Sequence, residues 1–238
     1  MDYEFTIIVP LYNEEENLVR VEKELNNYLK IAVKKTCVLF VNDGSSDKSL
    51  ALIEAISKRN PSFNYITFEQ NQGLSAAIKA GFDYSKTPLI GYIDSDLQTD
   101  PEDFNLLLEH IEEYDLVTGV RTDRKDSFKK NISSTIANLI RRSFTQDGMD
   151  DTGCPLKVIK ADYAKRIPMF KGLHRFLPAM ILLQNGKIKQ IPVRHYPRIA
   201  GTAKFFILNR LFGPLADCFA YLWMRRSYIN YKVISKDE

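Results

Sequence analysis

Short apolar runs alternate with amphipathic segments along the first 120 residues of the chain. Between the runs, apolar side chains recur every three or four residues, as in Leu18, Val21, Leu25 and Leu29, which is the spacing of a helix with one buried face. Alternating strands and helices predict an α/β fold with a mostly parallel sheet and crossover helices. The strands are expected over Phe5–Val9, Cys37–Val41, Tyr65–Phe68, Leu89–Ile93 and Leu116–Val120.

Polar residues and proline between these runs predict where further helices begin. Ser46 or Asp47 is expected to cap the second helix, because short polar side chains accept hydrogen bonds from the first turn. Another helix is expected over Leu74–Tyr84, and one more from Pro101 to about Glu112, since proline suits a first helical turn. The buried stripe of the second helix is expected to be Leu50, Ile53 and Ile56.

The pattern changes after Val120. A basic, serine-rich stretch runs to Arg142. Beyond it we expect a strand over Leu156–Ile159, a helix around Leu177–Leu183 and a strand over Lys187–Val193. A loop that contains proline and glycine follows the last strand.

The stretch from Phe205 to Met224 is strongly apolar but is interrupted by Arg210, Gly213-Pro214 and Asp217. A membrane-spanning helix needs about 20 apolar residues with almost no charge. We therefore expect two short amphipathic helices that lie on a membrane surface or pack on a partner. The residues expected at that interface are Tyr221, Trp223, Arg225 and Arg226. The alternative is a C-terminal element that packs on its own domain.

Composition narrows the class of protein. The 238 residues include 45% hydrophobic and 26% charged side chains, which excludes a disordered or fibrous chain. The net charge of +3 argues against a dedicated nucleic-acid binder. Three cysteines without CxxC spacing make a disulfide framework or a zinc site improbable and favour a reducing cytosol. The acidic start of the chain is unlike a signal peptide.

Polar turns follow three of the expected strands, and they are the first candidates for a functional site. Ligands of a parallel α/β sheet bind beyond the carboxyl ends of its strands. All three acid-bearing turns are expected at that one edge, and this convergence is the main evidence for a site. The turns are Pro10 to Glu14, Asn42 to Asp47, and Asp94 to Gln98.

Asp94 and Asp96 are two residues apart in a segment expected to be extended, so their side chains are expected on the same side. Two carboxylates, with Gln98 as a third oxygen donor, suit Mg²⁺ or Mn²⁺. Such sites use one or two carboxylates and leave other positions to substrate phosphates. A DxD pair alone is a weak signal, and its alternative is a solvated turn. Its place at a strand end favours the metal site.

The turn after the second strand leaves two readings open. Asp43 is a candidate acceptor of hydrogen bonds from a nucleobase or ribose, and it is equally well placed for an ordinary turn with Gly44. Asn71 to Leu74 opens a helix whose backbone N–H groups can help to hold an anionic ligand.

Together these turns resemble a known family. The segments VPLYNEEENL, VNDGSSDKS, NQGLSAAIKAGFDYS and IDSDLQTDPED are similar to blocks of the family 2 glycosyltransferases of the GT-A fold, in the dolichyl-phosphate mannose synthase-like branch. The resemblance runs from about Thr6 to Lys204. It implies transfer of a sugar from a GDP- or UDP-linked donor to a polyprenyl phosphate. It also implies that Asp94, Asp96 and Gln98 bind the metal, and that the nucleotide is held by Pro10, Tyr12, Glu14, Asp43 and Asp94.

The later blocks of the resemblance imply an acceptor site. GVR with Arg124, DTGCPLK and RIAGTAKF occupy the places of the family's acceptor blocks. Lys157 stands where arginine is commoner, and Ala203 and Phe205 replace serine and tyrosine, which puts hydroxyl contacts there in doubt. The implied catalytic residues are Asp96, Arg121 and Arg124. The residues implied to bind the acceptor phosphate are Arg121, Arg124, Lys157, Arg198 and Lys204.

The resemblance also divides the chain and places it in the cell. Residues 1–204 are expected to form the catalytic domain, with a nucleotide-binding half to about 120 and an acceptor-binding half from about 121. Residues 205–238 are expected to be an amphipathic tail that holds the enzyme at the cytoplasmic face of a membrane. A second copy of the chain or a membrane protein stays open as a partner.

The chemistry of such a transfer needs no general base. A phosphate monoester is largely ionised at pH 7, since its second pKa is about 6. Metal on one side and Arg or Lys on the other can offset repulsion between acceptor and diphosphate, and the family precedent is a single displacement with inversion. The alternatives are a saccharide acceptor, a catalytically silent nucleotide-sugar-binding subunit and a nucleotidyltransferase. No Gly-rich phosphate loop follows the first strand, which disfavours the last.

Overall fold

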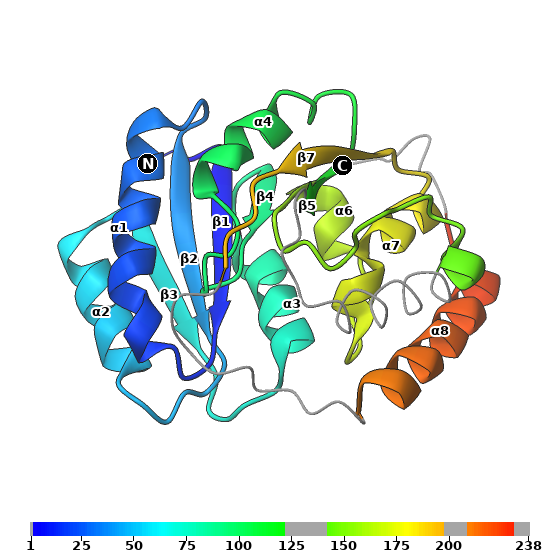
Figure 1. The fold of residues 1–238 in the computed structure, drawn as a ribbon, viewed down its shortest axis with the longest axis horizontal. Coiled ribbons are helices and arrows are strands. Elements are labelled where there is room, and N and C mark those ends of the chain that lie inside the picture. The colour runs from blue at the N-terminus through cyan, green and yellow to red at the C-terminus, as the bar shows by residue number, and fades with distance from the viewer. Residues whose placement is uncertain (1, 122–141, 198–208, 231–238) are drawn as a thin grey trace, which may run out of the picture.

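A single mixed sheet forms the centre of the molecule (Figure 1). The computed structural model describes residues 2–121, 142–197 and 209–230. Within these residues seven strands are hydrogen-bonded in the order β3-β2-β1-β4-β6-β5-β7. The strands are β1 (Phe5–Leu11), β2 (Thr36–Asn42), β3 (Phe63–Thr67), β4 (Leu89–Tyr92), β5 (Leu116–Arg121), β6 (Lys157–Lys160) and β7 (Ile188–Val193).

Helices cover both faces of this sheet. Residues of α1, α2 and α4 pack on one face, and residues of α3, α6, α7 and α8 pack on the other. The α-helices are α1 (Glu15–Ile31), α2 (Ser49–Arg59), α3 (Leu74–Tyr84), α4 (Phe104–Leu108), α6 (Ala161–Lys165), α7 (Leu177–Leu183) and α8 (Asn209–Ser227). Two short 3₁₀ turns are η1 (Pro101–Asp103) and η2 (Leu173–Phe176). The predicted α/β class with a mostly parallel sheet is confirmed.

The sheet is parallel except at β6, which runs antiparallel to both β4 and β5. The pattern of the sequence predicted this strand but not its direction. Since β6 lies between its two neighbours, it separates the parallel set β3-β2-β1-β4 from the parallel pair β5-β7.

The helix predicted from Pro101 to about Glu112 is shorter in the structure. It begins as η1 and ends at Leu108 in α4. The chain then continues in turns that bond three residues back, as from His110 N–H to the Leu107 carbonyl. Glu109, Glu112 and Glu113 follow, and carboxylates near a helix C-terminus are unfavourable because the helix dipole is negative there.

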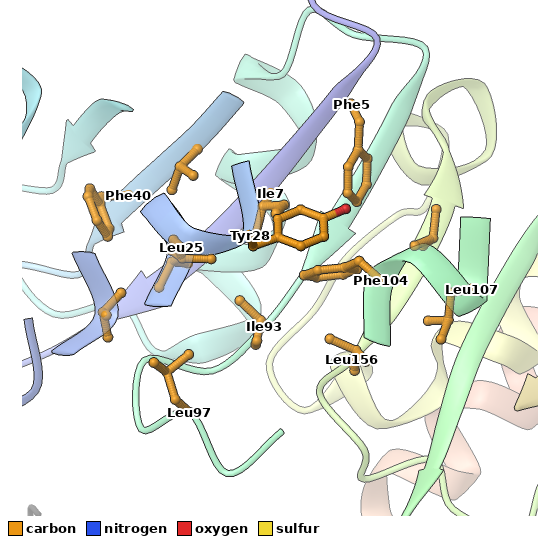
Figure 2. Packing of buried hydrophobic residues seen from close by; sticks show 14 of the residues in the cluster. Phe5, Ile7, Leu25, Tyr28, Phe40, Ile93, Leu97, Phe104, Leu107 and Leu156 are labelled. Atoms are coloured by element: carbon orange, nitrogen blue, oxygen red, sulfur yellow. The ribbon is translucent and has the colours of Figure 1, made fainter. Parts of the chain in front are cut away.

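The core follows from the alternation of side chains along the central strands. In β1, Phe5, Ile7 and Val9 face the layer of α1 and α4, whereas Ile8 faces the layer of α3. Figure 2 shows the aromatic centre of the first layer, where Phe104 lies 5.3 Å from the ring of Phe5 and 5.8 Å from that of Tyr28. This packing fixes α4, and with it the turn that precedes it, against the central strand.

The C-terminal element differs from the prediction of two short helices. Residues Asn209–Ser227 form one helix, α8, which continues through Gly213 and Pro214. Pro214 lies in the second turn of α8, so its missing N–H removes one hydrogen bond near the helix start and leaves the later turns intact. No helix within the described ranges is long and apolar enough to cross a bilayer.

One side of α8 packs on the domain. The Tyr221 ring stacks on Phe176 at 5.8 Å, Cys218 is buried, and Asp217 pairs with Arg175 at 3.4 Å. The prediction that Tyr221 lies at an interface with a membrane surface or a partner is therefore wrong, because its side chain is buried against its own domain and only 2% exposed.

The other side of α8 carries aromatic side chains into solvent. Phe219 is 59% exposed and Trp223 is 70% exposed, and the two lie one helical turn apart. Arg225 and Arg226 follow and are exposed as well. Both sides of α8 therefore carry apolar residues: one side is buried against the domain, and the other is exposed.

Phe104→Ala is expected to destabilise the protein by about 3–5 kcal/mol. The reason is that Phe104 is fully buried between two aromatic rings, so its removal leaves a cavity in the core. Leu106→Ala is the control, because this neighbour on the same short helix is 42% exposed. Urea denaturation measures both changes, and equal losses would contradict the packing described here.

Candidate active site

The carboxyl ends of β1 and β4 form the point where the strand order of the sheet reverses. From β1 the chain proceeds to β2 and β3 on one side, and then returns to β4 on the other. The helices α1 and α2 cover one face, while α3 covers the opposite face. The loop after β1 leads to α1 and the loop after β4 leads to α4, and both helices pack on the same face. Parallel α/β sheets bind their ligands in the crevice beyond the strand ends at such a reversal.

The turns after β1 and β2 are held together by side-chain hydrogen bonds. Asn13, whose φ is +52°, donates its backbone N–H to Ser45 Oγ at 2.9 Å. Its own Oδ1 accepts the backbone N–H of Ser46 at 2.8 Å. Short polar side chains make such turns specific, because they satisfy backbone groups that no strand or helix pairs. The two turns therefore form one rigid unit.

Asp47 ties the starts of two helices to this unit. Its carboxylate accepts the backbone N–H of Ser49, the first residue of α2, at 2.9 Å, and that of Glu15, the first residue of α1, at 3.2 Å. Of the two predicted capping residues, Asp47 therefore makes contact with the helix start. These bonds lower the pKa of Asp47, although burial acts in the opposite direction.

The residues implied to bind the nucleotide lie along this unit. Pro10 is buried in β1 opposite Val41, while Tyr12 and Glu14 are half-buried in the following turn. Glu14 accepts a hydrogen bond from the Asn17 amide at 2.6 Å. The structure brings these residues and Asp43 to neighbouring strand ends, as the sequence predicted.

Asp43 organises the loop that leads into α3. Its carboxylate accepts the backbone N–H groups of Gln72 at 2.7 Å and Gly73 at 2.8 Å, and the Asn71 amide at 2.9 Å. The Asp43 carboxylate thus shapes the edge of the crevice. The turn with Gly44 that the sequence left open is made instead by Asn42, which accepts the Ser45 N–H at 3.2 Å.

Gly44 permits the close approach of these two loops. Its φ is +65°, and a Cβ on it would lie 2.5 Å from the carbonyl carbon of Gln70. A side chain would therefore collide with backbone that cannot move aside. The contact keeps the Asn71–Gly73 segment against the end of β2.

Asp94 and Asp96 lie in a tight turn and not in the extended segment that the sequence predicted. The turn closes with a bond from the Leu97 N–H to the Asp94 carbonyl at 3.2 Å, and Leu97 has a φ of +45°. The Gln98 N–H donates to Asp96 Oδ1 at 3.2 Å. The turn is tight because Leu97 is buried in the core, where it is only 2% exposed.

The two carboxylates lie close enough to influence each other. Burial and the negative charge of Asp96 together raise the pKa of Asp94 to about 6, although a 2.5 Å hydrogen bond from Tyr92 and the charges of Lys157 and Arg121 oppose the rise. A buried pair of carboxylates is unfavourable without a cation. Their oxygens are the donors that Mg²⁺ and Mn²⁺ prefer, so the residues present fit such an ion.

Among the residues that the structure describes, this pair has no third titratable ligand. The described ranges contain no group of three or more His, Cys, Asp and Glu residues arranged to hold a metal. Gln98, predicted as a further donor, turns its amide nitrogen to the Tyr196 carbonyl at 3.3 Å. A divalent ion at this turn would therefore take its remaining ligands from a substrate or water.

Arg121 lies at the end of β5, near the turn from Asp94 to Gln98. This turn is called the metal turn below, because its two carboxylates fit a divalent ion. Its guanidinium binds Asp151 with both arms, at 2.7 Å from Nε and 2.8 Å from Nη2. The bonds to Asp151 raise the pKa of Arg121 against the effect of burial. Arg121 is thereby held in one orientation, with its charge near Asp94.

Lys157 does not lie where the sequence-based prediction of a phosphate ligand requires. It is 1% exposed, and its ammonium group donates to the carbonyls of Thr152 and Cys154. Burial lowers its pKa. Lys157 begins β6, which lies between β4 and β5, so its side chain stays inside the protein. Arg124, Arg198 and Lys204 lie outside the described residues.

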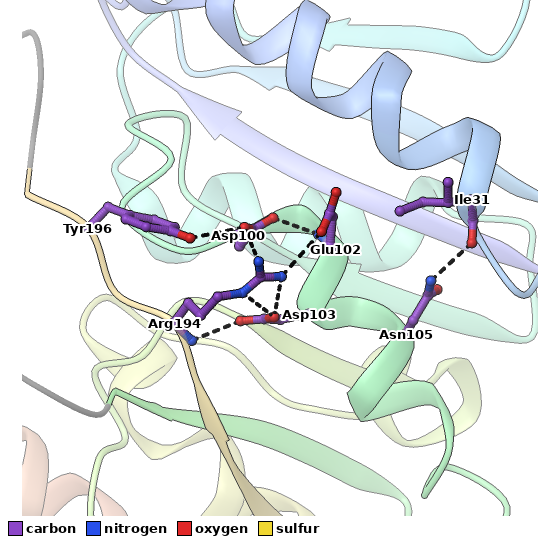
Figure 3. Close-up of polar contacts among 7 residues, drawn as sticks. All are labelled: Ile31, Asp100, Glu102, Asp103, Asn105, Arg194 and Tyr196. Carbon is purple, nitrogen blue, oxygen red and sulfur yellow. Dashed lines mark hydrogen bonds and ion pairs between the residues drawn. The ribbon is translucent and has the colours of Figure 1, made fainter.

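Two arginines at the site were missed by the sequence analysis. Arg20 of α1 donates to the carbonyls of Leu97 at 3.2 Å and Asp96 at 3.5 Å. Arg194, directly after β7, binds the acidic residues that follow the metal turn (Figure 3). Three acids between Asp100 and Asp103 were a usable signal for a basic partner. A lone arginine on a helix, such as Arg20, gave none.

Comparison with known proteins places this geometry in a family. The sequence model described as "Glycosyl transferase family 2" matches residues 6–166. Dodecaprenyl-phosphate galacturonate synthase of Rhizobium johnstonii is 29% identical over 229 residues, which cover 94% of this chain and 68% of that protein.

Solved structures agree on the fold. Glucosyl-3-phosphoglycerate synthase of Mycobacterium tuberculosis superposes with a TM-score of 0.72 at 14% identity, over 96% of this chain and 81% of that one. A mannosyltransferase of Pyrobaculum calidifontis gives a TM-score of 0.66 at 15% identity, over 93% of this chain and 64% of its own. With the family match spanning most of the sheet and the metal turn, the chain belongs to the family 2 glycosyltransferases and has the GT-A fold that the sequence predicted.

Proposed function

We propose that this protein transfers a sugar from a nucleotide sugar to a polyprenyl phosphate with inversion at the anomeric carbon. The observation that carries the proposal is that a pair of carboxylates and an arginine lie near each other at the carboxyl ends of the strands. Asp94, after β4 and beside Asp96, lies near enough to Arg121 at the end of β5 for each charge to favour the other. The name of the Rhizobium relative, a dodecaprenyl-phosphate sugar synthase, supports a lipid phosphate as acceptor.

The donor is assigned to the half of the chain up to about residue 120. Pro10, Tyr12, Glu14 and Asp43 would line the nucleotide, while Asp94 and Asp96 would hold Mg²⁺ or Mn²⁺ at its diphosphate. The structural neighbours were crystallised with Mn²⁺ and either UDP-glucose or GDP-mannose, which supports the metal and leaves both nucleotides open.

The acceptor is assigned to residues from about 121 to 204. Arg121, Arg124, Arg198 and Lys204 would receive the phosphate, and Lys157 would support the floor of the site from within. The Mycobacterium neighbour is named for a phosphorylated acceptor as well, phosphoglyceric acid. Residues 205–238 are assigned to the tail.

The described carboxylates near the acceptor side favour a phosphate over a sugar hydroxyl. A hydroxyl acceptor needs a general base, usually a carboxylate in reach of its proton. Asp151 has both oxygens bound to Arg121, Asp150 pairs with Arg142, and Asp147 accepts the Met149 N–H. A phosphate monoester is already ionised near pH 7 and needs no such base.

In this mechanism the protein positions two anions that repel each other. When bound, the metal ion supplies positive charge to the leaving diphosphate. Arg121, held by Asp151, places its cation on the acceptor side of Asp94 and so lowers the repulsion between acceptor and donor. The rigid turns after β1 and β2 orient the donor so that one displacement inverts the anomeric carbon.

We further propose that α8 holds the enzyme at the cytoplasmic face of a membrane. A polyprenyl phosphate keeps its head at the bilayer interface, so the active site must reach that surface. The exposed aromatic side of α8, with Arg225 and Arg226 after it, matches a helix that lies in the headgroup region. A second copy of the chain or a membrane protein is the alternative occupant of this surface.

The test of the function is a transfer assay with paired acceptors. Labelled UDP- and GDP-sugars are incubated with Mn²⁺ or Mg²⁺ and with undecaprenyl phosphate, free undecaprenol or a saccharide. Label in the lipid phosphate alone is the expected result. Transfer to the saccharide instead would support the alternative acceptor. If none of these acceptors led to release of nucleotide, the result would point away from a polyprenyl-phosphate enzyme.

Asp96→Asn is expected to reduce transfer by at least about 100-fold, because the loss of one metal-binding carboxylate removes several kcal/mol of transition-state stabilisation. Its unfolding free energy should not fall, since the change removes the repulsion with Asp94. Asp83→Asn is the control, as Asp83 is a half-exposed carboxylate on α3 paired with Lys79. Full activity of Asp96→Asn would overturn the metal assignment.

Asp43→Asn is expected to weaken nucleotide binding by roughly tenfold or more, because an amide cannot accept at both positions and the loop before α3 loses part of its support, a change of about 1–3 kcal/mol. Asp115→Asn is a matched control. Asp115 also accepts a backbone N–H, that of Lys187 at 2.8 Å, but at the opposite end of the strands. Calorimetry with UDP and GDP should find a loss of affinity in the first variant only.

Trp223→Ser is expected to weaken binding to vesicles containing phosphatidylserine by about tenfold, since burial of such a side chain contributes about 1.5–3 kcal/mol. Tyr84→Ser is the control, because Tyr84 is 66% exposed but lies on α3. Flotation measures the binding. Equal flotation of the wild type and Trp223→Ser would contradict the membrane role, and a dimer that only Trp223→Ser abolishes would assign the surface to a second copy.

A further inference from the structure

Arg194 binds three acidic side chains that follow the metal turn. Its Nε and Nη2 donate to Asp103 Oδ1 at 2.9 and 2.7 Å, its Nη1 lies 3.0 Å from Asp100, and Nη2 lies 3.4 Å from Glu102. Its backbone N–H donates to the other oxygen of Asp103 at 2.8 Å. Figure 3 shows this cluster between the start of η1 and the end of β7.

Arg194 and Asp103 differ in burial, and the buried carboxylate holds the exposed arginine in one position. The Asp103 side chain is 2% exposed, whereas that of Arg194 is 48% exposed. A buried carboxylate without a cationic partner would be unfavourable, so Asp103 strongly favours the bound position of Arg194. A planar guanidinium that satisfies several carboxylates in fixed directions gives a single geometry, which a lysine cannot reproduce.

The two residues after Arg194 are joined to the metal turn itself. Thr99 and His195 form an antiparallel bridge, and the Tyr196 N–H donates to the Gln98 carbonyl at 2.8 Å. In return the Gln98 amide donates to the Tyr196 carbonyl at 3.3 Å. The Tyr196 hydroxyl also donates to Asp100 at 3.3 Å. Backbone and side chain of Gln98 are therefore fixed by the segment that Arg194 anchors.

The same segment leads directly to the acceptor side. In the register of β5 and β7, Arg121 lies opposite Val193, one residue before Arg194. The chain continues through Pro197 to Arg198, which belongs to the proposed acceptor-binding set. The segment from Val193 to Pro197 thus joins the strand end of Arg121 to the metal turn and directly precedes Arg198 in the sequence.

We propose that Arg194 is a positioning residue that holds the metal turn and the segment from Val193 to Pro197, which precedes the proposed acceptor residue Arg198, in a fixed relation. The contacts of Arg194 are seen in the structure, whereas their consequence for catalysis rests on the proposed function. In the protein without ligands, Arg194 keeps Gln98 and Tyr196 paired. During turnover it keeps the donor diphosphate and the acceptor phosphate in one alignment.

The variants for the test separate this role from simple stability. Arg194→Met removes all of the ion pairs and keeps the length of the side chain, while Arg194→Lys keeps the charge but not the planar fork. Arg59→Met is the matched control, because Arg59 also binds a carboxylate with two nitrogens, that of Glu22, on the surface between α1 and α2. Asp100→Asn is a milder variant for use if Arg194→Met does not fold.

The first measurement needs no ligand. Hydrogen exchange at the backbone amides of Leu97, Gln98 and Tyr196 is expected to be about tenfold faster in Arg194→Met than in the wild type, with unchanged exchange in β1 and β2. Arg59→Met should leave all of these amides unchanged. Exchange that is unchanged at the three amides, or faster throughout the chain, would overturn the positioning role.

The second measurement is titration with MnCl₂ in the presence of UDP or GDP. The Mn²⁺ concentration for half-saturation is expected to rise about tenfold in Arg194→Met, comparable to the lower end of what loss of a direct partner of a metal ligand costs, because the segment that holds Gln98 loses its anchor; it should recover in part in Arg194→Lys. Unchanged Mn²⁺ binding in a folded Arg194→Met would reject the inference. A wild type that binds neither nucleotide with Mn²⁺ would reject the proposed function, while the exchange comparison would still decide the role of Arg194.

Discussion

Asp94 and Asp96 bring two negative charges to a buried turn at the end of β4, and the surrounding protein is arranged around that unfavourable pair. Tyr92 donates to one of the carboxylates, and Lys157 and Arg121 lower its pKa from a distance. Arg20 stabilises the turn without neutralising it, because it binds backbone carbonyls. The repulsion is only partly compensated, so an added cation would stabilise the turn.

The support for this turn comes from segments that are remote in sequence. Arg20 lies 77 residues before Leu97, and Gln98 lies 98 residues before Tyr196. Each segment reaches the turn because parallel strands deliver their carboxyl ends to the same edge. The donor side is made rigid in a different way, through short polar side chains in turns that follow adjacent strands. The site is therefore stiff on both sides of the crevice before any ligand arrives.

Local patterns in the sequence predicted much of this architecture. The ranges of α3 and α7 agree with the predicted Leu74–Tyr84 and Leu177–Leu183, because apolar spacing and flanking polar residues define them locally. β3 begins at Phe63, two residues before its prediction, since its edge position exposes much of the strand and weakens the apolar signal. The strand-end turns also converge as expected.

Features that depend on distant partners could not be read from local patterns. The direction of β6 is set by β4 and β5, and the burial of Lys157 follows from that direction. The burial of one side of α8 depends on packing of Tyr221 against Phe176. Likewise, the turn at Asp94–Leu97 is tight because Leu97 enters the core, whereas the sequence alone suggested extended backbone.

The antiparallel strand β6 has a consequence for how the chain folds during synthesis. β4 and β5 are consecutive among the strands in sequence, yet neither pairs with the other, and β6 supplies the ladder that joins them. The parallel set from β3 to β4 can form its hydrogen bonds as soon as it leaves the ribosome. β5 must wait until β6 has been made, and its apolar residues remain unpaired in the meantime. Completion of the sheet beyond β4 is therefore a late, non-local step, and the interval before it is when a nascent chain would most need protection from aggregation.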